Sequence, residues 1–247
     1  MGRRLIHSRS RCPATTLVCS SDFARRPGRE PTRSVSAERH HVQMQTPATP
    51  SRARRVQWLV VAIFVATVAQ LTVGTFARDL PQFADKGFGA RLFTYPLLML
   101  VVPATWLLYS RRSGETKPVP VAAFAFVMAP FLVDVTGNTL DLYDRVTWWD
   151  DANHFVNWFL LSMGLGLLLR RSATGWLLAL VVTGVGAVLA IGWEIGEWYT
   201  FIRMGTELDT AYEDTLGDQV LGTLGAALAG VLLASRRRSH QERGAGQ

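Results

Sequence analysis

Six long apolar segments dominate this sequence and limit what it can fold into. They cover residues 56–77, 92–110, 118–140, 152–169, 172–201 and 219–235. Each is close to the roughly 20 residues that a helix needs to cross a hydrocarbon core of about 30 Å. The segments are continuously apolar rather than alternating, which favours helices over a membrane barrel. The sequence therefore predicts an all-α, polytopic membrane helix bundle with six transmembrane helices.

Polar sequence flanks these segments at both ends. Residues 1–55 are rich in Arg, Ser, Thr and Pro, a composition that buries too little apolar surface to offset the entropy of ordering. We expect a disordered basic N-terminal tail there, with translation from Met44 as an alternative start. The six-helix domain then covers residues 56–235, and residues 236–247 form a second basic tail. Cys12 and Cys19 both lie in the first tail, so no disulfide or thiolate metal site is expected among the helices.

Lys and Arg are concentrated in every second loop. These residues are Arg52, Arg54, Arg55, Arg111, Arg112, Lys117, Arg170, Arg171, Arg236, Arg237 and Arg238. Because cytoplasmic loops carry the excess of Lys and Arg, the alternation predicts a multi-pass cell-membrane protein with its N-terminus and C-terminus in the cytoplasm. The formal charge of +7 then serves topology beside the lipid bilayer, and we expect no nucleic-acid partner.

Acidic, amide and histidine side chains gather at the predicted extracytoplasmic ends of the last four spans. They recur three or four residues apart, so those on one span share a helix face. They are Asp134, Asn138 and Asp141 on the third span, Asp150, Asp151, His154 and Asn157 on the fourth, Glu194 and Glu197 on the fifth, and Asp214 and Asp218 before the sixth. The sequence thus predicts one polar, acidic pocket that opens to the extracytoplasmic side.

Carboxylates inside a bilayer are costly, at about 2.5 kcal/mol or more each, and normally find partners within the bundle. Several of them at one depth repel one another unless they are protonated, paired with a cationic side chain or bridged by a metal ion. Arg145 and Arg203 are the cationic side chains that we expect to pair with them.

His154 is the histidine that lies within a predicted span, whereas His7, His40, His41 and His240 lie in the tails. An imidazole beside carboxylates is a ligand set for Zn, Mn or a similar divalent ion, and it also suits a general base or a proton relay. The candidate metal ligands are His154, Asp150, Glu194, Glu197, Asp214 and Asp218, and the candidate catalytic residues are His154, Asp150 and Glu194. The alternative is that Asp150 or Asp151 only caps the fourth span and hydrogen-bonds His154.

Three blocks in the second half of the chain resemble the YjdF-like family of small bacterial inner-membrane proteins and, more distantly, the VanZ-like family. The blocks are Tyr-Asp-Arg at 143–145 with Asp-Asp-Ala-Asn-His-Phe at 150–155, Trp-Glu-Ile-Gly-Glu-Trp at 193–198, and Tyr-Glu-Asp-Thr-Leu-Gly-Asp at 212–218 before a Gly-rich segment. In YjdF-like proteins the Tyr-Asp-Arg element directly precedes the His-Phe pair. Because residues intervene here, either Asp144 or Asp150 is the equivalent acid. The resemblance implies a shared helical fold and polar site, and no defined activity.

Three functions remain compatible with these residues, and whether the protein is an enzyme stays open. The first is a bacterial integral membrane protein whose pocket binds a divalent metal ion and acts on an envelope or lipid-linked substrate. The second is an ion or small-solute transporter or binding protein that uses the carboxylates as a relay. The third is a non-catalytic membrane scaffold or envelope-stress factor in which the polar residues only set helix register.

Overall fold

A computed structural model describes residues 51–84, 86–114, 118–203 and 210–245, all within one unit formed by residues 47–247. The predicted start at Met44 and residues 1–50 of the predicted disordered tail lie outside these ranges, whereas residues 51–55, which are part of that predicted tail, are helical. The described residues form helices and turns and contain no strand, which confirms the all-α prediction.

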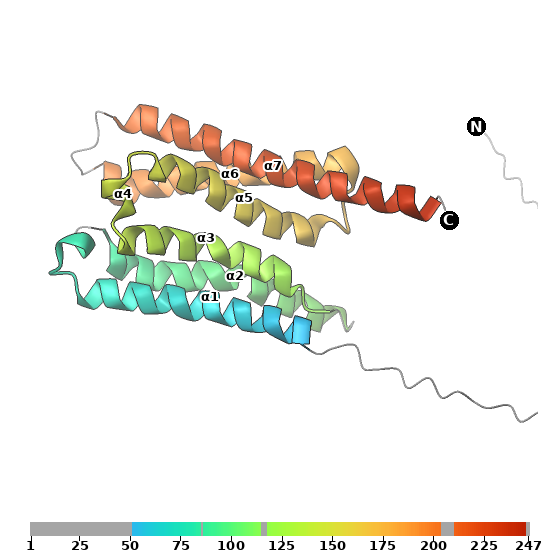
Figure 1. Ribbon diagram of the computed structural model, residues 1–247, viewed down its shortest axis with the longest axis horizontal. Helices are drawn as coiled ribbons and strands as arrows, with labels where there is room; N and C mark the ends of the chain where they lie inside the picture. Colours follow the sequence, from blue (N-terminus) through green and yellow to red (C-terminus); the bar gives the residue numbers. More distant parts are fainter. Residues whose placement is uncertain (1–50, 85, 115–117, 204–209, 246–247) are drawn as a thin grey trace, which may run out of the picture. The chain divides into compact units, whose positions relative to one another are not determined.

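Six long helices make up the bundle (Figure 1). They are α1 (Ser51–Phe76), α2 (Phe88–Ser113), α3 (Val121–Thr139), α5 (Trp149–Leu169), α6 (Gly175–Glu197) and α7 (Ala211–Ala245). Three short elements lie between them: η1 (Pro81–Phe83), α4 (Leu142–Arg145) and the π-helical turn η2 (Trp198–Ile202). In the described part of the chain, six helices are long and apolar enough to cross a membrane. The prediction of a multi-pass membrane bundle is therefore confirmed.

The last span begins earlier than its hydropathy suggests. We expected it to start at Gln219, but α7 begins at Ala211. The extra turns contain Glu213 and Asp214, and acidic side chains are favourable at the positive end of the helix dipole. Polarity in this stretch is therefore compatible with a helix start, and Asp218 becomes a residue of the helix.

The helices pack as two groups of three that meet at α3 and α5. Helices α1, α2 and α3 contact one another, as do α5, α6 and α7, and the contact between α3 and α5 joins the groups. Each group has its own apolar core. One is built around Leu71, Tyr95 and Val135, and the other around Leu178 and Ala229.

Two glycines allow the backbone of α5 to lie close to both of its neighbours. A Cβ atom added to Gly164 would lie 2.8 Å from the backbone oxygen of Ala123 in α3. A Cβ atom on Gly225 of α7 would collide with the backbone oxygen of Phe155 in α5. Small residues permit this close approach of membrane helices. Helix α5, which carries His154, is therefore held tightly on two sides.

The outer surface of the helices is apolar, as contact with lipid requires. On α6, Leu180, Val188 and Ile195 are all exposed. On a soluble protein, a large exposed apolar surface marks a contact with a membrane or another protein. On helices long enough to span a membrane, it is the surface that faces lipid.

The two ends of the bundle differ in charge. The start of α1 and the end of α7 lie at one end, and η1 and α4 lie at the other (Figure 1). Arg111 and Arg112 close α2 at the first of these ends. The Lys and Arg pattern therefore falls on the end that carries the termini of the bundle, and the assignment of that end to the cytoplasm stays a prediction.

Candidate functional site

The centre of the candidate site is the buried side chain of His154 on α5. Its Nδ1 atom lies 2.8 Å from Oδ1 of Asp218 on α7 and 3.5 Å from Oδ1 of Asp150, one turn earlier on α5. On the other side of the ring, Nε2 lies 3.6 Å from Oε1 of Glu194 on α6. Three helices therefore bring carboxylates to both nitrogens of one imidazole.

Glu197 extends the acidic side of this group toward the cavity described below. His154, Glu194 and Glu197 each offer a ligand atom, and these atoms all lie within 4.8 Å of one another. His154, Asp150 and Asp218 meet the same 4.8 Å limit on the other side of the ring. We call these five residues the acid–histidine cluster.

Of the six candidate metal ligands, five belong to this cluster and Asp214 does not. Asp214 is exposed in the first turn of α7 and lines the mouth of the cavity. Asp218, one turn further along α7, is only 3% exposed. The structure thus brings His154, Asp150, Glu194, Glu197 and Asp218 together and leaves Asp214 at the rim.

The capping alternative does not describe the start of α5. Its N-cap residue is Trp148, and no side chain makes a capping hydrogen bond there. Asp151 is exposed, whereas Asp150 faces His154 with both its carboxylate and its backbone oxygen, the latter 3.3 Å from Nδ1. Asp150 therefore belongs with the histidine rather than with the helix end.

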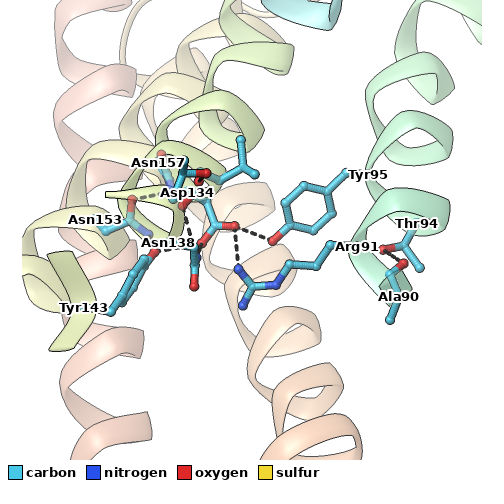
Figure 2. Close-up of polar contacts among 11 residues, drawn as sticks. Ala90, Arg91, Thr94, Tyr95, Asp134, Asn138, Tyr143, Asn153 and Asn157 are labelled. Carbon is cyan, nitrogen blue, oxygen red and sulfur yellow. Dashed lines mark hydrogen bonds and ion pairs between the residues drawn. The ribbon is translucent and has the colours of Figure 1, made fainter. Parts of the chain in front are cut away.

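A second polar centre surrounds Asp134 on α3, which is 8% exposed (Figure 2). Its Oδ2 atom accepts a hydrogen bond of 2.6 Å from the Tyr95 hydroxyl and lies 3.1 Å from Nη1 of Arg91, both on α2. Its Oδ1 atom accepts from the Tyr143 hydroxyl at 2.7 Å and from Nδ2 of Asn138 at 3.3 Å. Four donors from three elements compensate the charge of this one carboxylate.

The hydrogen bonds continue from Asp134 to α5 (Figure 2). The Tyr143 oxygen accepts from Nδ2 of Asn153 at 2.5 Å, and Oδ1 of Asn153 accepts from Nδ2 of Asn157 at 3.0 Å. Because an ionised carboxylate only accepts, it sets the direction of every bond in this series. We call Asp134, Tyr143, Asn153 and Asn157 the Asp134 relay.

Sequence reasoning placed several of these residues correctly and missed others. Asp134 and Asn138 do share a face, but the prediction that Asp141 lies on the same face is wrong. Helix α3 ends at Thr139, and Asp141 has a φ of 60° in the left-handed region. Arg91 and Tyr95 were missed as site residues; the available signal was a single Arg in the first turn of an otherwise apolar segment.

The expected cationic partners of the buried acids are also different. Arg145 pairs with Asp141 at 3.0 Å and is 73% exposed in its side chain. Arg203 lies over the Tyr199 ring, 5.0 Å from its centroid. Arg91 is the cation that reaches a buried acid, Asp134. The pairing of Arg91 with Asp134 depends on the packing of α2 against α3, which no local sequence pattern shows.

An ion cluster covers the outer edge of the site and joins two loops. The Lys86 ammonium, which follows η1, lies 2.7 Å from Asp141 and 2.5 Å from Asp144 of α4. The hydrogen bond from Lys86 lowers the pKa of Asp141 below its ordinary value. Partial burial opposes charging of Lys86, but hydrogen bonds to both carboxylates outweigh it and raise its pKa. Both groups are therefore charged at neutral pH.

A cavity of about 560 Å³ lies between the two centres. Its walls include His154 and Asp150 from the acid–histidine cluster and Asp134 and Asn157 from the relay, and its apolar part includes Phe131. Cavities of this size, with apolar walls and a few converging polar groups, are typical small-molecule sites. The protein is thus a multi-pass membrane helix bundle with a polar cavity inside its helices.

Comparison with protein families agrees with this class. A family described as a predicted membrane protein family, DUF2238, matches residues 56–239 of the chain. The chain therefore belongs to this family, and the match covers all six spans. Neither the curated proteins nor the solved structures contain a match to it. The resemblance to YjdF-like and VanZ-like proteins stays a prediction, because the matched family carries neither name.

Proposed function

We propose that this membrane protein binds a divalent metal ion in the acid–histidine cluster and uses it to act on an envelope or lipid-linked substrate. His154, through Nε2, and the carboxylates of Glu194 and Glu197 are the ligands in this proposal. Asp218 and Asp150 lie beside Nδ1, at the opposite edge of the imidazole ring. The cavity provides the space for the substrate.

One observation carries the proposal: the unpaired oxygen of Glu194. Its Oε1 atom is buried and has no hydrogen-bond donor among the described residues, and it points at Nε2 of His154 from 3.6 Å. That separation is too long for an N–H···O hydrogen bond. A buried carboxylate oxygen without a donor is costly, and a cation between the two atoms would remove the cost.

The two distances at the ring assign different roles to the two nitrogens. The 2.8 Å between Nδ1 and Asp218 is a normal hydrogen-bond length, so Nδ1 carries a proton, and in the neutral ring that would bind a metal Nε2 presents a lone pair. Two ligand atoms about 2.0–2.1 Å from one tetrahedral cation lie roughly 3.3–3.4 Å apart. The Nε2 to Oε1 distance of 3.6 Å fits that arrangement, whereas the Nδ1 to Asp218 distance does not.

In this proposal Asp218 does not bind the metal ion but accepts a hydrogen bond from the histidine that does. Histidines that bind metals usually donate their second ring N–H to a carboxylate or carbonyl, which fixes the tautomer and makes the other nitrogen a better ligand. Asp218 and the backbone oxygen of Asp150 both face Nδ1. One imidazole and two carboxylates suit Zn or Mn better than Mg or Ca.

If the site is catalytic, the bound ion supplies a Lewis acid and an activated water. The side chains of this protein then have two tasks. Asp150 lines the cavity and is placed to accept a proton as a general base, and Glu194 holds charge beside Nε2. These roles develop the sequence-based assignment of His154, Asp150 and Glu194 as catalytic residues.

The test is elemental analysis of protein purified without chelators, then reloaded with Zn or Mn after dialysis. We expect about one ion per wild-type chain, and almost none in His154→Ala or Glu194→Gln. Asp218→Asn should retain the ion with about 10- to 100-fold weaker affinity, as for other outer partners. Asp151→Asn is the matched control, because Asp151 is adjacent but exposed. Equal metal content in the wild type and His154→Ala would overturn the proposal.

A further inference from the structure

Many of the donor side chains at the cavity already have partners inside the protein. Seven of them each make a hydrogen bond or an ion pair with another side chain. They are Lys86, Arg91, Tyr95, Asn138, Tyr143, Asn153 and Asn157. Among the described side chains that line the cavity, the buried polar atom without a partner is an acceptor, Oδ1 of Asn157.

The Asp134 relay ends at Asn157 and leaves the side-chain oxygen of this residue as a hydrogen-bond acceptor. Asp134 makes Tyr143 a donor, which leaves the Tyr143 oxygen to accept from Asn153, and the Asn153 oxygen then accepts from Asn157. This order leaves Oδ1 of Asn157, which is buried and has no donor among the described residues. Asn157 lines the cavity, about 12 Å along α5 from its first residue.

The charge of the cavity wall favours a cation. Five carboxylates line it against two cationic side chains, and both of those cations are paired with acids. The carboxylates are Asp134, Asp144, Asp150, Glu197 and Asp214. A divalent ion on His154 would still leave an excess of negative charge, so a ligand with a net negative charge is disfavoured in the rest of the cavity.

Aromatic rings add to this preference and indicate where an apolar chain can leave. Tyr95 of α2 and Trp193 of α6 both line the cavity, and their ring centroids lie 6.4 Å apart. Ring faces attract ammonium groups. Within the described residues, the backbones of α2 and α6 do not pack closely against each other. Side chains rather than packed backbones thus separate the cavity from lipid on this side, while Pro130, Phe131 and Leu161 form an apolar wall.

We propose that the cavity binds the primary ammonium group of an amphipathic amine, such as an ethanolamine lipid, with Oδ1 of Asn157 accepting one of its N–H bonds. This names a substrate class for the proposed function and rests on it for the chemistry that follows binding. Binding itself uses Asn157 and the relay, which are separate from the metal ligands.

The test compares lipids that differ in N–H donors. Protein in nanodiscs of equal phosphatidylethanolamine, phosphatidylcholine and phosphatidylglycerol is extracted into detergent, and retained lipid is identified by mass spectrometry. We expect phosphatidylethanolamine to be retained about tenfold over phosphatidylcholine, because the trimethylated head group has no N–H to donate. Asn157→Leu should abolish this preference. Soluble glycerophosphoethanolamine should not displace the lipid; if it does so at equal concentration, the ammonium comes from a soluble ligand and the lipid part of the proposal is wrong.

Two further variants separate a lost acceptor from a misfolded bundle. Tyr143→Phe leaves Asn157 in place but breaks the relay, and it should reduce the preference at unchanged metal content. Thr200→Val is the matched control: Thr200 lines the cavity, but its hydroxyl donates to the Gly196 oxygen at 2.7 Å, so the preference should persist. Equal retention of the ethanolamine and choline lipids by the wild type overturns the inference, even where metal is bound. A preference without metal overturns the proposed function alone.

Discussion

The Asp134–Arg91 pair allows a sharp test of how this bundle tolerates charge inside the membrane. Both side chains are largely buried, with 11% and 16% of their surfaces exposed. Removing one partner of such a pair costs about 3–5 kcal/mol, mainly because the remaining charge is left uncompensated. We expect Asp134→Leu to lower the free energy of unfolding by at least this much, since Tyr95 and Tyr143 lose their acceptor as well.

Arg91→Met should be milder, at about 1.5–3 kcal/mol. The Asp134 carboxylate then keeps the hydroxyls of Tyr95 and Tyr143 and the amide of Asn138 as donors. Added to Asp134→Leu, the same Arg91→Met substitution should recover stability, because it removes the charge that had lost its partner. The coupling between the two sites should therefore exceed the cost of Arg91→Met alone, at about 3 kcal/mol.

The measurement is reversible unfolding in mixed micelles, followed by tryptophan fluorescence for the wild type, both single variants and the double variant. The reasoning fails if the double variant is less stable than Asp134→Leu alone. It also fails if the two single substitutions cost the same, because the other donors to Asp134 would then carry no weight.

Four further predictions follow from packing, charge and topology. Gly225→Leu should separate α7 from α5, where the backbone oxygen of Phe155 leaves no room for a side chain, and should cost more than 2 kcal/mol of unfolding free energy; a change below 0.5 kcal/mol in the same assay would contradict it. The Lys86–Asp141 link should hold at neutral pH. It should weaken as pH falls through the lowered pKa of Asp141, below its ordinary 3.8, and as pH rises through the raised pKa of Lys86, above its ordinary 10.5. Protection factors of the α4 amides, corrected for intrinsic exchange, should stay constant from about pH 5 to about pH 9 and fall only outside this window; loss of protection already at pH 5 would refute the prediction. Arg145→Gln should change the free energy of unfolding by less than about 1 kcal/mol, because the Arg145 side chain is mostly exposed. A reporter that is active only in the cytoplasm, fused after residue 247, should be active if both ends of the bundle face the inside of the cell.

The two polar centres explain how a bundle this apolar holds so many acids. Asp134 is compensated within the protein by Arg91 and by hydroxyl and amide donors. Glu194 is not: its Oε1 atom lacks a donor among the described residues. Structural acids are satisfied by their neighbours, whereas an acid that remains unsatisfied is a candidate to bind a cation from outside the chain. This contrast is why we propose the cation at Glu194 and not at Asp134.

The sequence alone determined the spans, the membrane class and the identity of most candidate site residues. Apolar length is a local property, so it can be read without knowing which helices touch. The i, i+4 spacing of Asp150 and His154 likewise predicts a shared helix face, and the structure places both in the acid–histidine cluster.

Only the tertiary structure decided which polar groups meet. Arg91 and Asp134 are separated by 43 residues, and nothing local shows that α2 brings one to the other. The same holds for Asp218, which reaches His154 because α7 starts early and packs against α5 through Gly225. Hydrogen bonds and metal sites require distances between their atoms that are correct to within a few tenths of an ångström. The packing of the whole bundle sets those distances, and no single segment does.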